Sequence, residues 1–300
     1  MKIWVTGATG LIGSRVVQAL EARGDEAIRI TRGPSEPPRT VHWDPDGDEI
    51  EASIDDVDGI IHLAGENIAA GRWTAAQRRR LLESRVKGTS LLARRLAEQT
   101  AKSISFVSAS AIGIYGDRGP DWVDEAAAPG DLFLSEICVA WESAADPAKQ
   151  AGHRVVHPRI GVVLSREGGA LGKMLLPFQL GLGGPVGSGA QYISWVTLDD
   201  VVAMLLFCLD RPEVEGPVNL VGPEPARQRD FAQALGRTLG RPAVLPVPAF
   251  GIRALFGQMG RELLLSSTRA SSKKIESLGY RFRHASLDAA LKAALTTSEA

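Results

Sequence analysis

The stretch Met1–Gly13, MKIWVTGATGLIG, decides the fold of this chain. Its first part, Lys2–Thr6, is short, apolar and β-branched, which is typical of a buried parallel strand. Gly7, Gly10 and Gly13 follow at GxxGxxG spacing, and an amphipathic helical pattern continues from them. A strand, a glycine turn and a helix predict a dinucleotide-binding unit, because the glycines let backbone approach a pyrophosphate at the helix N-terminus. A purely structural glycine turn is the alternative.

The whole-chain composition sets the broad class of protein. The chain has 300 residues, 44% of them hydrophobic, and a net charge of −1. Without a basic excess, we expect no nucleic-acid partner and no contact with an anionic membrane. No run of about 18 or more apolar residues predicts a membrane span. Because the chain begins on its predicted first strand, we expect no signal peptide and a cytoplasmic protein.

The two cysteines, Cys138 and Cys208, both lie in apolar helical patterns. Such a pattern favours buried free thiols over a disulfide framework or a pair of metal ligands. The sequence therefore predicts no metal site.

The end of the second predicted strand, Glu26–Thr31, bears on cofactor choice. In a dinucleotide fold this strand end meets the adenosine ribose, where an acid binds the 2′-OH of NAD and an arginine accommodates the 2′-phosphate of NADP. Here no acid follows the strand, and Arg32 does. The planar, permanently charged guanidinium suits phosphate, so we predict NADP(H) over NAD(H). An ordinary surface arginine is the alternative.

Further strands and helices alternate along the chain. Strands are predicted at 58–64, 103–110 and 154–164, and helices at 74–96 and 132–148. This alternation predicts an α/β protein with a Rossmann-type doubly wound parallel sheet, in which the carboxyl ends of the strands form the ligand crevice. Ser108 and Ser110 end one strand and are expected at that crevice. Gly88, inside the first of these helices, predicts close packing against the sheet.

The second half of the chain indicates a smaller domain. The glycine-rich stretch 166–190 and residues 223–300 are predicted to form a small C-terminal substrate-binding domain, whereas 1–165 and 191–222 form the NADP-binding domain. Asp199 and Asp200 precede an apolar helix and are expected to cap it. Tyr192 and Trp195 either line the substrate pocket or belong to the core.

Several motifs in order resemble the extended short-chain dehydrogenase/reductase family. They are the glycine motif, His62–Gly65, Ser108 and Ser110 followed by Tyr115-Gly116, Pro158-Arg159, and Trp195–Val201. The segments Ala64–Ile68 (AGENI), Glu83–Arg85 (ESR) and Leu175–Val196 resemble its epimerase-like branch, described as YfcH-like or sulA-like. The resemblance covers essentially the whole chain. It implies a Rossmann-type NADP(H)-binding protein, an epimerase or oxidoreductase, and a homodimer.

The strand ends and this resemblance together nominate the site residues. The candidate cofactor residues are Gly7, Thr9, Gly10, Leu11, Ile12, Gly13, Thr31, Arg32, Leu63, Ala64, Gly65, Arg80, Arg85, Ser108 and Val162. The candidate substrate residues are Glu66, Asn67, Tyr192 and Trp195. The run Arg78–Arg80 is either a solvated helix face or a source of contacts to cofactor phosphates.

One departure from the family concerns proton transfer. The family uses a Tyr and, one helical turn later, a Lys that lowers its pKa. In this chain Leu134 and Cys138 stand at about those positions. Ser110 matches the catalytic serine, and Tyr115 is the nearby phenol, either an acid/base or a hydrogen-bonded loop tyrosine.

Two functions follow from these residues. The first is an NADP(H)-dependent epimerase or reductase acting on a small carbonyl or sugar-nucleotide-like substrate, with Ser110 and Tyr115 as candidate catalytic residues. The second is a non-catalytic NADP(H)-sensing protein, which the absent Tyr and Lys favour. The retained glycines and Ser110 favour the enzyme. The sequence does not name the small-molecule substrate.

Overall fold

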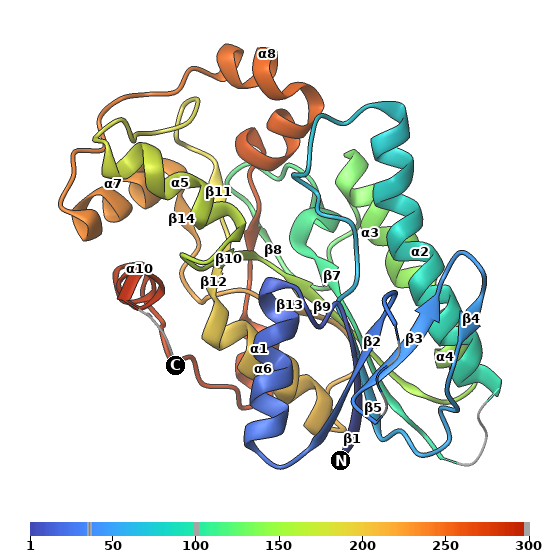
Figure 1. Cartoon of the computed structure of the whole chain (residues 1–300). Helices are drawn as coiled ribbons and strands as arrows, with labels where there is room; N and C mark the ends of the chain where they lie inside the picture. Colours follow the sequence, from blue (N-terminus) through green and yellow to red (C-terminus); the bar gives the residue numbers. More distant parts are fainter. Residues whose placement is uncertain (35, 37, 99–101, 297–300) are drawn as a thin grey trace.

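A mostly parallel sheet lies at the centre of the computed structural model, which describes residues 1–34, 36, 38–98 and 102–296 (Figure 1). Within these residues nine strands join it in the order β13-β9-β6-β5-β1-β2-β3-β4, and β7 pairs with β9. The strands are β1 (Lys2–Thr6), β2 (Glu26–Thr31), β3 (Thr40–Asp44), β4 (Glu49–Ile50), β5 (Gly59–His62), β6 (Ser105–Ser108), β7 (Ser110–Ala111), β9 (Arg154–Ile160) and β13 (Gly216–Leu220). The predicted Rossmann-type sheet is confirmed, with β1 paired in parallel to β2 and β5.

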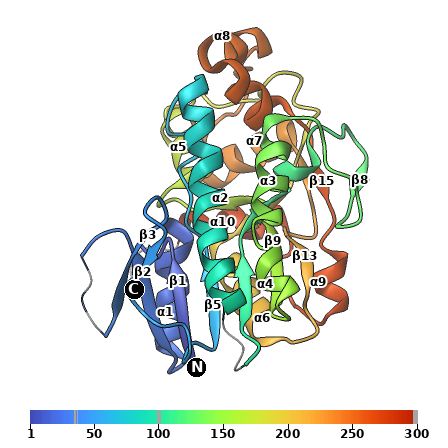
Figure 2. The same cartoon turned by 90° about the vertical axis from the view of Figure 1, so that its right-hand side faces the viewer.

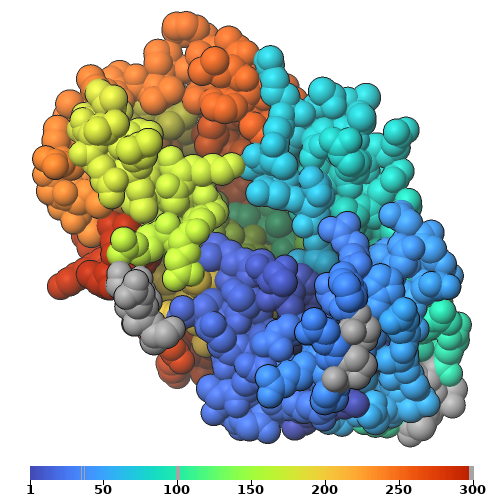
Figure 3. Space-filling view, viewed as in Figure 1, coloured from blue at the N-terminus to red at the C-terminus, as the bar shows by residue number. Residues whose placement is uncertain are grey.

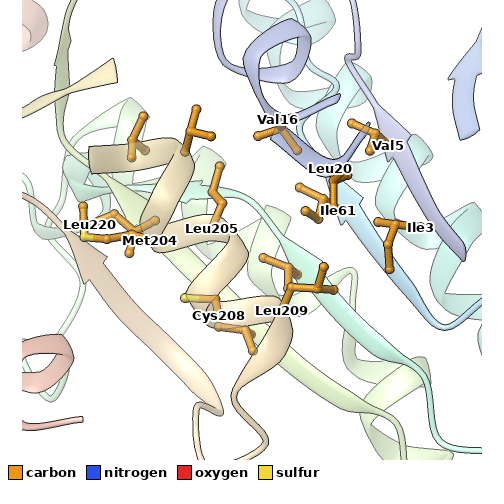
Figure 4. Packing of buried hydrophobic residues seen from close by; sticks show 14 of the residues in the cluster. Ile3, Val5, Val16, Leu20, Ile61, Met204, Leu205, Cys208, Leu209 and Leu220 are labelled. Carbon is orange, nitrogen blue, oxygen red and sulfur yellow. The ribbon is translucent and has the colours of Figure 1, made fainter. Parts of the chain in front are cut away.

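Helices cover both faces of this sheet (Figures 1 and 2). Helices α1 (Leu11–Ala22) and α6 (Leu198–Asp210) share one face, and α2 (Ala75–Glu98), α3 (Phe133–Ser143) and α4 (Asp146–Gln150) lie on the other. Figure 4 shows side chains of α6, including Met204 and Leu205, on the same side as Val16 of α1. Burying apolar faces on both sides explains why the strands are continuously hydrophobic.

A smaller lobe lies beyond the carboxyl ends of the strands (Figure 1). Its helices are α5 (Gly169–Gln179), α7 (Gln228–Leu239), α8 (Ala249–Gly260), the π-helical turn η2 (Arg261–Leu265) and α10 (Leu287–Thr296). Short strand pairs accompany them: β10 (Val162–Leu164) with β12 (Trp195–Thr197), β11 (Tyr192–Ile193) with β14 (Ala226–Arg227), and β8 (Trp122–Val123) with β15 (Arg269–Ala270). Helix α9 (Lys273–Ser277) returns to the sheet, where Ile275 and Tyr280 join the same core as α1 and α6.

Three predicted elements are each split in the structure. The strand expected over 103–110 divides into β6 and β7. The helix expected over 132–148 divides into α3 and α4, and Pro147 stands at the start of α4, where its missing N–H costs no hydrogen bond. The strand expected over 154–164 divides at Gly161. A Cβ on Gly161 would lie 2.6 Å from the Ser194 carbonyl oxygen, so the chain needs glycine there, and beyond it β10 pairs with β12.

The cap of α6 differs from the sequence expectation. The N-cap is Thr197, whose hydroxyl oxygen accepts from the Asp200 N–H at 3.1 Å. Asp200 is instead buried, and its carboxylate accepts from the Tyr280 hydroxyl at 2.8 Å and the Arg283 N–H at 2.9 Å. Its carboxylate therefore anchors the segment that follows α9.

The buried thiols and the packing of Gly88 are confirmed. Cys138 and Cys208 are free and buried. A Cβ on Gly88 would lie 2.9 Å from the Trp43 ring of β3 and 3.4 Å from the His62 ring of β5. Glycine is thus required for α2 to approach the sheet this closely.

Candidate cofactor and active site

The glycine turn between β1 and α1 is shaped by backbone contacts. Gly7 has φ +66°, and a Cβ there would lie 2.8 Å from the Leu63 carbonyl carbon of the neighbouring strand end. A Cβ on Gly13 would lie 2.1 Å from the Gly7 carbonyl oxygen. The loop is therefore closed tightly on itself as well as on β5, which only glycine permits.

The N-terminus of α1 is open to an anion. Its N-cap is Gly10, no side chain caps it, and no acidic residue occupies its first turn. The unpaired N–H groups of Leu11 and Ile12, together with the positive end of the helix dipole, would favour a phosphate. Thr9 and Gly10 are exposed beside them, so the residues present fit a dinucleotide pyrophosphate.

A buried hydrogen-bond chain ties β5 to β1 and α2. The Thr6 hydroxyl oxygen accepts from the Leu63 and Ala64 N–H groups, both at 3.1 Å, and its hydrogen goes to His62 Nδ1 at 2.6 Å. His62 Nε2–H then donates to the Thr89 hydroxyl oxygen at 3.0 Å. Complete burial, assisted by the positive charge of Arg85, lowers the pKa of His62 to about 3. A neutral histidine thus holds the strand end that carries Leu63, Ala64 and Gly65.

The end of β2 carries an unengaged arginine. Thr31 is half-buried, and its hydroxyl oxygen accepts from the Gly33 N–H at 3.1 Å, which fixes the turn. Arg32 is exposed, and among the described residues it makes no hydrogen bond and no ion pair. The guanidinium is therefore free to meet a ligand at this strand end.

The two other predicted arginines differ in position. Arg85 of α2 lies against Gly65, since a Cβ there would be 3.3 Å from the Arg85 guanidinium carbon. It donates to the Glu66 carbonyl at 3.1 Å and the Leu81 carbonyl at 3.0 Å, and burial lowers its pKa. Arg80 is exposed and donates to the Gln77 side chain. The structure therefore brings Arg85, but not Arg80, to the strand end at Gly65.

Buried polar atoms without partners lie on the side of the sheet that α2 and α3 cover. The guanidinium of Arg85 lies over the Trp141 ring, 5.0 Å from its centre. Trp141 Nε1 and Ser108 Oγ are both buried and, within the described residues, have no hydrogen-bond partner. In the register of the sheet, Ser108 lies opposite His62, at the carboxyl ends of β6 and β5. Such atoms in a native protein meet water or a ligand, which favours a polar occupant.

Ser110 belongs to an ion-pair network that sequence reasoning missed. Its hydroxyl donates to Glu142 Oε1 of α3 at 2.7 Å. Arg159 of β9 donates to both carboxylate oxygens of Glu142, each at 2.9 Å. The Arg159 side chain is 8% exposed and the Glu142 side chain 15% exposed. The Ser110 hydrogen is thus committed to the protein, and the side chain itself is buried, at 2% exposed.

Tyr115 is fully buried behind this network. Its hydroxyl donates to Asn219 Oδ1 at 2.6 Å and accepts from Arg159 Nη1 at 3.0 Å. Burial raises its pKa to about 12 despite the neighbouring Arg159. This arrangement is that of a structural tyrosine, so Tyr115 does not reach the crevice as an acid/base.

Apolar and neutral groups occupy the positions of the family's Tyr and Lys. A Cβ on Gly113 would lie 3.2 Å from Leu134 Cβ and 3.9 Å from Cys138 Sγ. Burial raises the pKa of Cys138 to about 11, so the thiol is neutral. No titratable group tuned near neutral pH stands at these two positions.

The predicted substrate residues do not form one cluster. Asn67 is exposed and its side-chain oxygen accepts from the Ala69 N–H at 2.9 Å. The Glu66 backbone is tied to α2 through Ser84, whose hydroxyl accepts from the Glu66 N–H at 3.1 Å. Tyr192 is half-buried between two arginines. Trp195 is a core residue, 1% exposed, with its indole N–H donating to the Glu224 carbonyl, so it does not line a pocket.

Segments of both lobes frame the mouth of the crevice. Figure 3 shows a hollow between the blue N-terminal segment, the cyan segment leading into α2 and the yellow-green segment containing α5. Helix α5 begins close to the glycine turn, because a Cβ on Gly169 would lie 3.7 Å from Leu11. Lys173 of α5 donates to the Ala69 carbonyl at 3.2 Å, and Arg72 donates to the Ala254 carbonyl of α8 at 3.0 Å. Val162, half-buried at the start of β10, follows Gly161.

The described residues contain neither a candidate metal cluster nor a candidate membrane-spanning helix. No group of three or more His, Cys, Asp or Glu side chains among them could hold a metal ion. No helix in the same part of the chain is long and apolar enough to span a bilayer.

The sheet order, the glycine turn and the second lobe define a Rossmann-type protein of the extended short-chain dehydrogenase/reductase class. Residues 3–222 match the family described as NAD dependent epimerase/dehydratase, and residues 247–294 match a domain of unknown function. The chain belongs to the NAD dependent epimerase/dehydratase family.

Named relatives and solved structures agree with this assignment. The epimerase family protein MT2273 of Mycobacterium tuberculosis is 40% identical over 293 residues, which cover 97% of each chain. The crystal structure of the human epimerase family protein SDR39U1 with NADPH has a TM-score of 0.90 and 35% identity, covering 99% of this chain and all of that one. A nucleoside-diphosphate sugar epimerase from Corynebacterium glutamicum has a TM-score of 0.81 and 32% identity over 98% of this chain and 58% of that chain.

Proposed function

We propose that this protein binds NADP(H) in the crevice and uses it to reduce or epimerise a small carbonyl or carbinol compound. The observation that carries the proposal is the end of β2, where Arg32 is exposed and has no partner among the described residues, and where no acid follows the strand to bind a ribose 2′-OH. The human relative crystallised with NADPH supports the same cofactor class. Sugar nucleotides are one substrate option, consistent with the Corynebacterium relative.

The residues of this chain divide the work of binding. The N–H groups at the start of α1 would hold the pyrophosphate, and Arg32 would hold the 2′-phosphate. Arg85 and the buried Ser108 hydroxyl would contact polar atoms of the cofactor near Gly65. A bound nicotinamide supplies or accepts hydride. Ser110, whose hydrogen is given to Glu142, would accept a hydrogen bond from a substrate hydroxyl and so orient a carbinol carbon.

Cofactor titration tests the proposal. Purified protein titrated with NADPH and with NADH, followed by nicotinamide fluorescence, should bind NADPH well ahead of NADH. Arg32→Ala should weaken NADPH binding at least about tenfold and leave NADH binding unchanged, because a charged hydrogen bond to the 2′-phosphate is lost. Arg211→Ala serves as the control, since Arg211 is exposed and follows α6 at the other end of the sheet. Equal NADPH affinity in Arg32→Ala would overturn the cofactor assignment.

A second function, NADP(H) sensing without turnover, is favoured by Leu134 and Cys138 at the family's acid/base positions. A panel of nucleotide sugars and small aldehydes separates the two functions. Turnover that is lost in Ser110→Ala supports the enzyme. Tight NADPH binding with no turnover on the panel supports the sensor.

A further inference from the structure

The exposed large hydrophobic side chains are concentrated on one part of the small lobe. Of thirteen such residues in the described part of the chain, ten lie between 176 and 182 or between 244 and 263. We call these ten the apolar surface. They are Leu176, Leu180, Leu182, Val244, Leu245, Val247, Phe250, Leu255, Phe256 and Leu263. Phe250 is 76% exposed and Leu255 68% exposed, and a concentration of exposed large apolar side chains of this kind marks an interaction surface.

The two segments that carry the apolar surface are joined. The Leu245 N–H donates to the Gly183 carbonyl at 3.1 Å, and the Val247 N–H donates to the Pro185 carbonyl at 2.8 Å. A Cβ on Gly187 would lie 3.7 Å from Ala249, the first residue of α8. The backbones that carry the apolar side chains therefore lie side by side in the small lobe, and α8 lies at the end of the molecule opposite the N-terminus (Figures 1 and 2).

Between residues 168 and 190 and between residues 241 and 263, every exposed charged residue is basic. Residues 168–190 contain Lys173 and no other charge, and residues 241–261 contain Arg241, Arg253 and Arg261 with no acid. All four are exposed, and within the described residues none pairs with a carboxylate. The nearest acid in sequence, Glu262, is buried and accepts from the N-terminus of α3 instead.

We propose that the apolar surface docks on an anionic lipid bilayer. Large apolar side chains, above all Phe250 and Leu255, combined with lysine and arginine and without acids, match the chemistry of an interfacial lipid-binding surface. A second copy of this chain fits less well. A two-fold interface on this surface would bring its four cations against the same four of the partner without a carboxylate between them.

The apolar surface lies close to the mouth of the crevice. Helix α5 starts beside Leu11 of the glycine turn and ends near the exposed Leu176 and Leu180. Arg72, which follows β5, donates to the Ala254 carbonyl of α8. The bilayer would therefore lie beside the mouth of the crevice. The net charge of −1 conceals this arrangement, because the acids that balance these cations lie elsewhere on the chain.

Vesicle sedimentation tests the proposal on the full chain. The protein is mixed with vesicles of phosphatidylcholine alone, or with about one third phosphatidylglycerol, and the bound fraction is measured at rising salt. We expect binding to the anionic vesicles that weakens with salt. Phe250→Ser with Leu255→Ser should reduce binding at least about tenfold, and Arg241→Gln with Arg253→Gln roughly fivefold for each arginine.

A matched control uses exposed hydrophobic residues outside the surface. Trp122→Ser with Val139→Ser, at side chains 52% and 39% exposed, should bind vesicles like the unchanged protein. Circular dichroism checks that each variant is folded. Absence of sedimentation with anionic vesicles, or equal binding by the Phe250 and Leu255 variant, would overturn the proposal. A dimer that this variant dissociates, without vesicle binding, would instead assign the surface to a second copy.

Discussion

The cofactor side of the crevice and the wall formed by α3 differ in whether their polar groups have hydrogen-bond partners. On the cofactor side, the α1 N-terminus has no capping side chain and Arg32 has no partner in the described residues. On the α3 wall, Ser110, Glu142 and Arg159 are paired with one another. The cofactor side therefore has hydrogen-bond donors available for a ligand, whereas the polar groups of the α3 wall are bonded to one another.

This difference separates cofactor binding from proton transfer. Unpaired backbone N–H groups and a free guanidinium gain their partners only when an anion arrives. On the α3 wall, the Ser110 hydroxyl already donates to an ion-paired carboxylate, and the Cys138 thiol is neutral. Neither group is tuned to exchange a proton near neutral pH. The crevice can therefore keep a cofactor even where the chemistry of the wider family is altered.

The largest expected effect concerns the α3 wall. Arg159→Met should lower the free energy of unfolding by about 3–5 kcal/mol, because the Glu142 carboxylate, whose side chain is only 15% exposed, loses both charged hydrogen bonds. Urea denaturation measures this. Arg211→Met, which breaks an exposed pair with Glu213 at 3.9 Å, is the control and should cost under about 1 kcal/mol. Equal losses in the two variants would contradict a structural role for the wall.

The next effect concerns the glycine turn. Gly13→Ala should cost roughly 2–3 kcal/mol and weaken NADPH binding, because its Cβ meets the Gly7 carbonyl oxygen at 2.1 Å. Gly251→Ala is matched, since both glycines are third residues of a helix and a Cβ on Gly251 meets nothing within 4 Å. That control should be neutral or stabilise by up to about 1 kcal/mol. Denaturation and nicotinamide fluorescence report the two effects, and an unchanged Gly13→Ala protein would refute the tight closure.

The third effect is a pH dependence from His62. Its folded pKa of about 3 lies below its ordinary value of 6.5, so between these values the unfolded chain binds a proton that the folded protein does not. The contribution is fully present above pH 6.5, and the free energy of unfolding falls by about 1.4 kcal/mol per unit as pH decreases below it. His62→Gln cannot titrate and should show a correspondingly smaller slope between pH 6.5 and pH 5. Parallel curves would contradict a buried neutral His62.

The smallest expected effect is a lack of reactivity. Burial raises the pKa of Cys138 to about 11 and that of Cys208 to about 12, which leaves almost no thiolate at pH 8. Neither thiol should react with a disulfide reagent in the native protein, and both should react in denaturant. Rapid labelling of Cys138 without denaturant would show that the α3 wall opens.

Local sequence predicted the first strand, the glycine turn and the first helix correctly because their determinants are adjacent in the chain. The strand Lys2–Thr6, the glycine turn and α1 follow one another without interruption. Arg85 was identified through the segment Glu83–Arg85, and the structure places it against Gly65. Arg80, only a little earlier on α2, points to a different neighbour, a distinction that spacing alone does not reveal.

The α3 wall was harder to predict because its contacts join distant residues. Glu142 is 32 positions after Ser110 and 17 before Arg159, although its place two helical turns beyond Leu134 was an available signal. Tyr115 and Trp195 each allowed two interpretations in sequence, and burial in the folded chain assigned both to structure. The apolar surface likewise joins two segments separated by about sixty residues.

The order of apolar runs and glycines was sufficient to specify the Rossmann-type sheet and its glycine turn, because periodicity and turn chemistry act over a few neighbouring residues. The family followed from the resemblance of motifs along the whole chain. Whether a hydroxyl, thiol or guanidinium is available for a ligand depends on which distant groups pack against it. The Ser110 hydroxyl is engaged by Glu142, whereas Arg32 has no partner among the described residues, and only the folded chain decides both. Burial and pairing are properties of three-dimensional neighbours, and no local pattern encodes them.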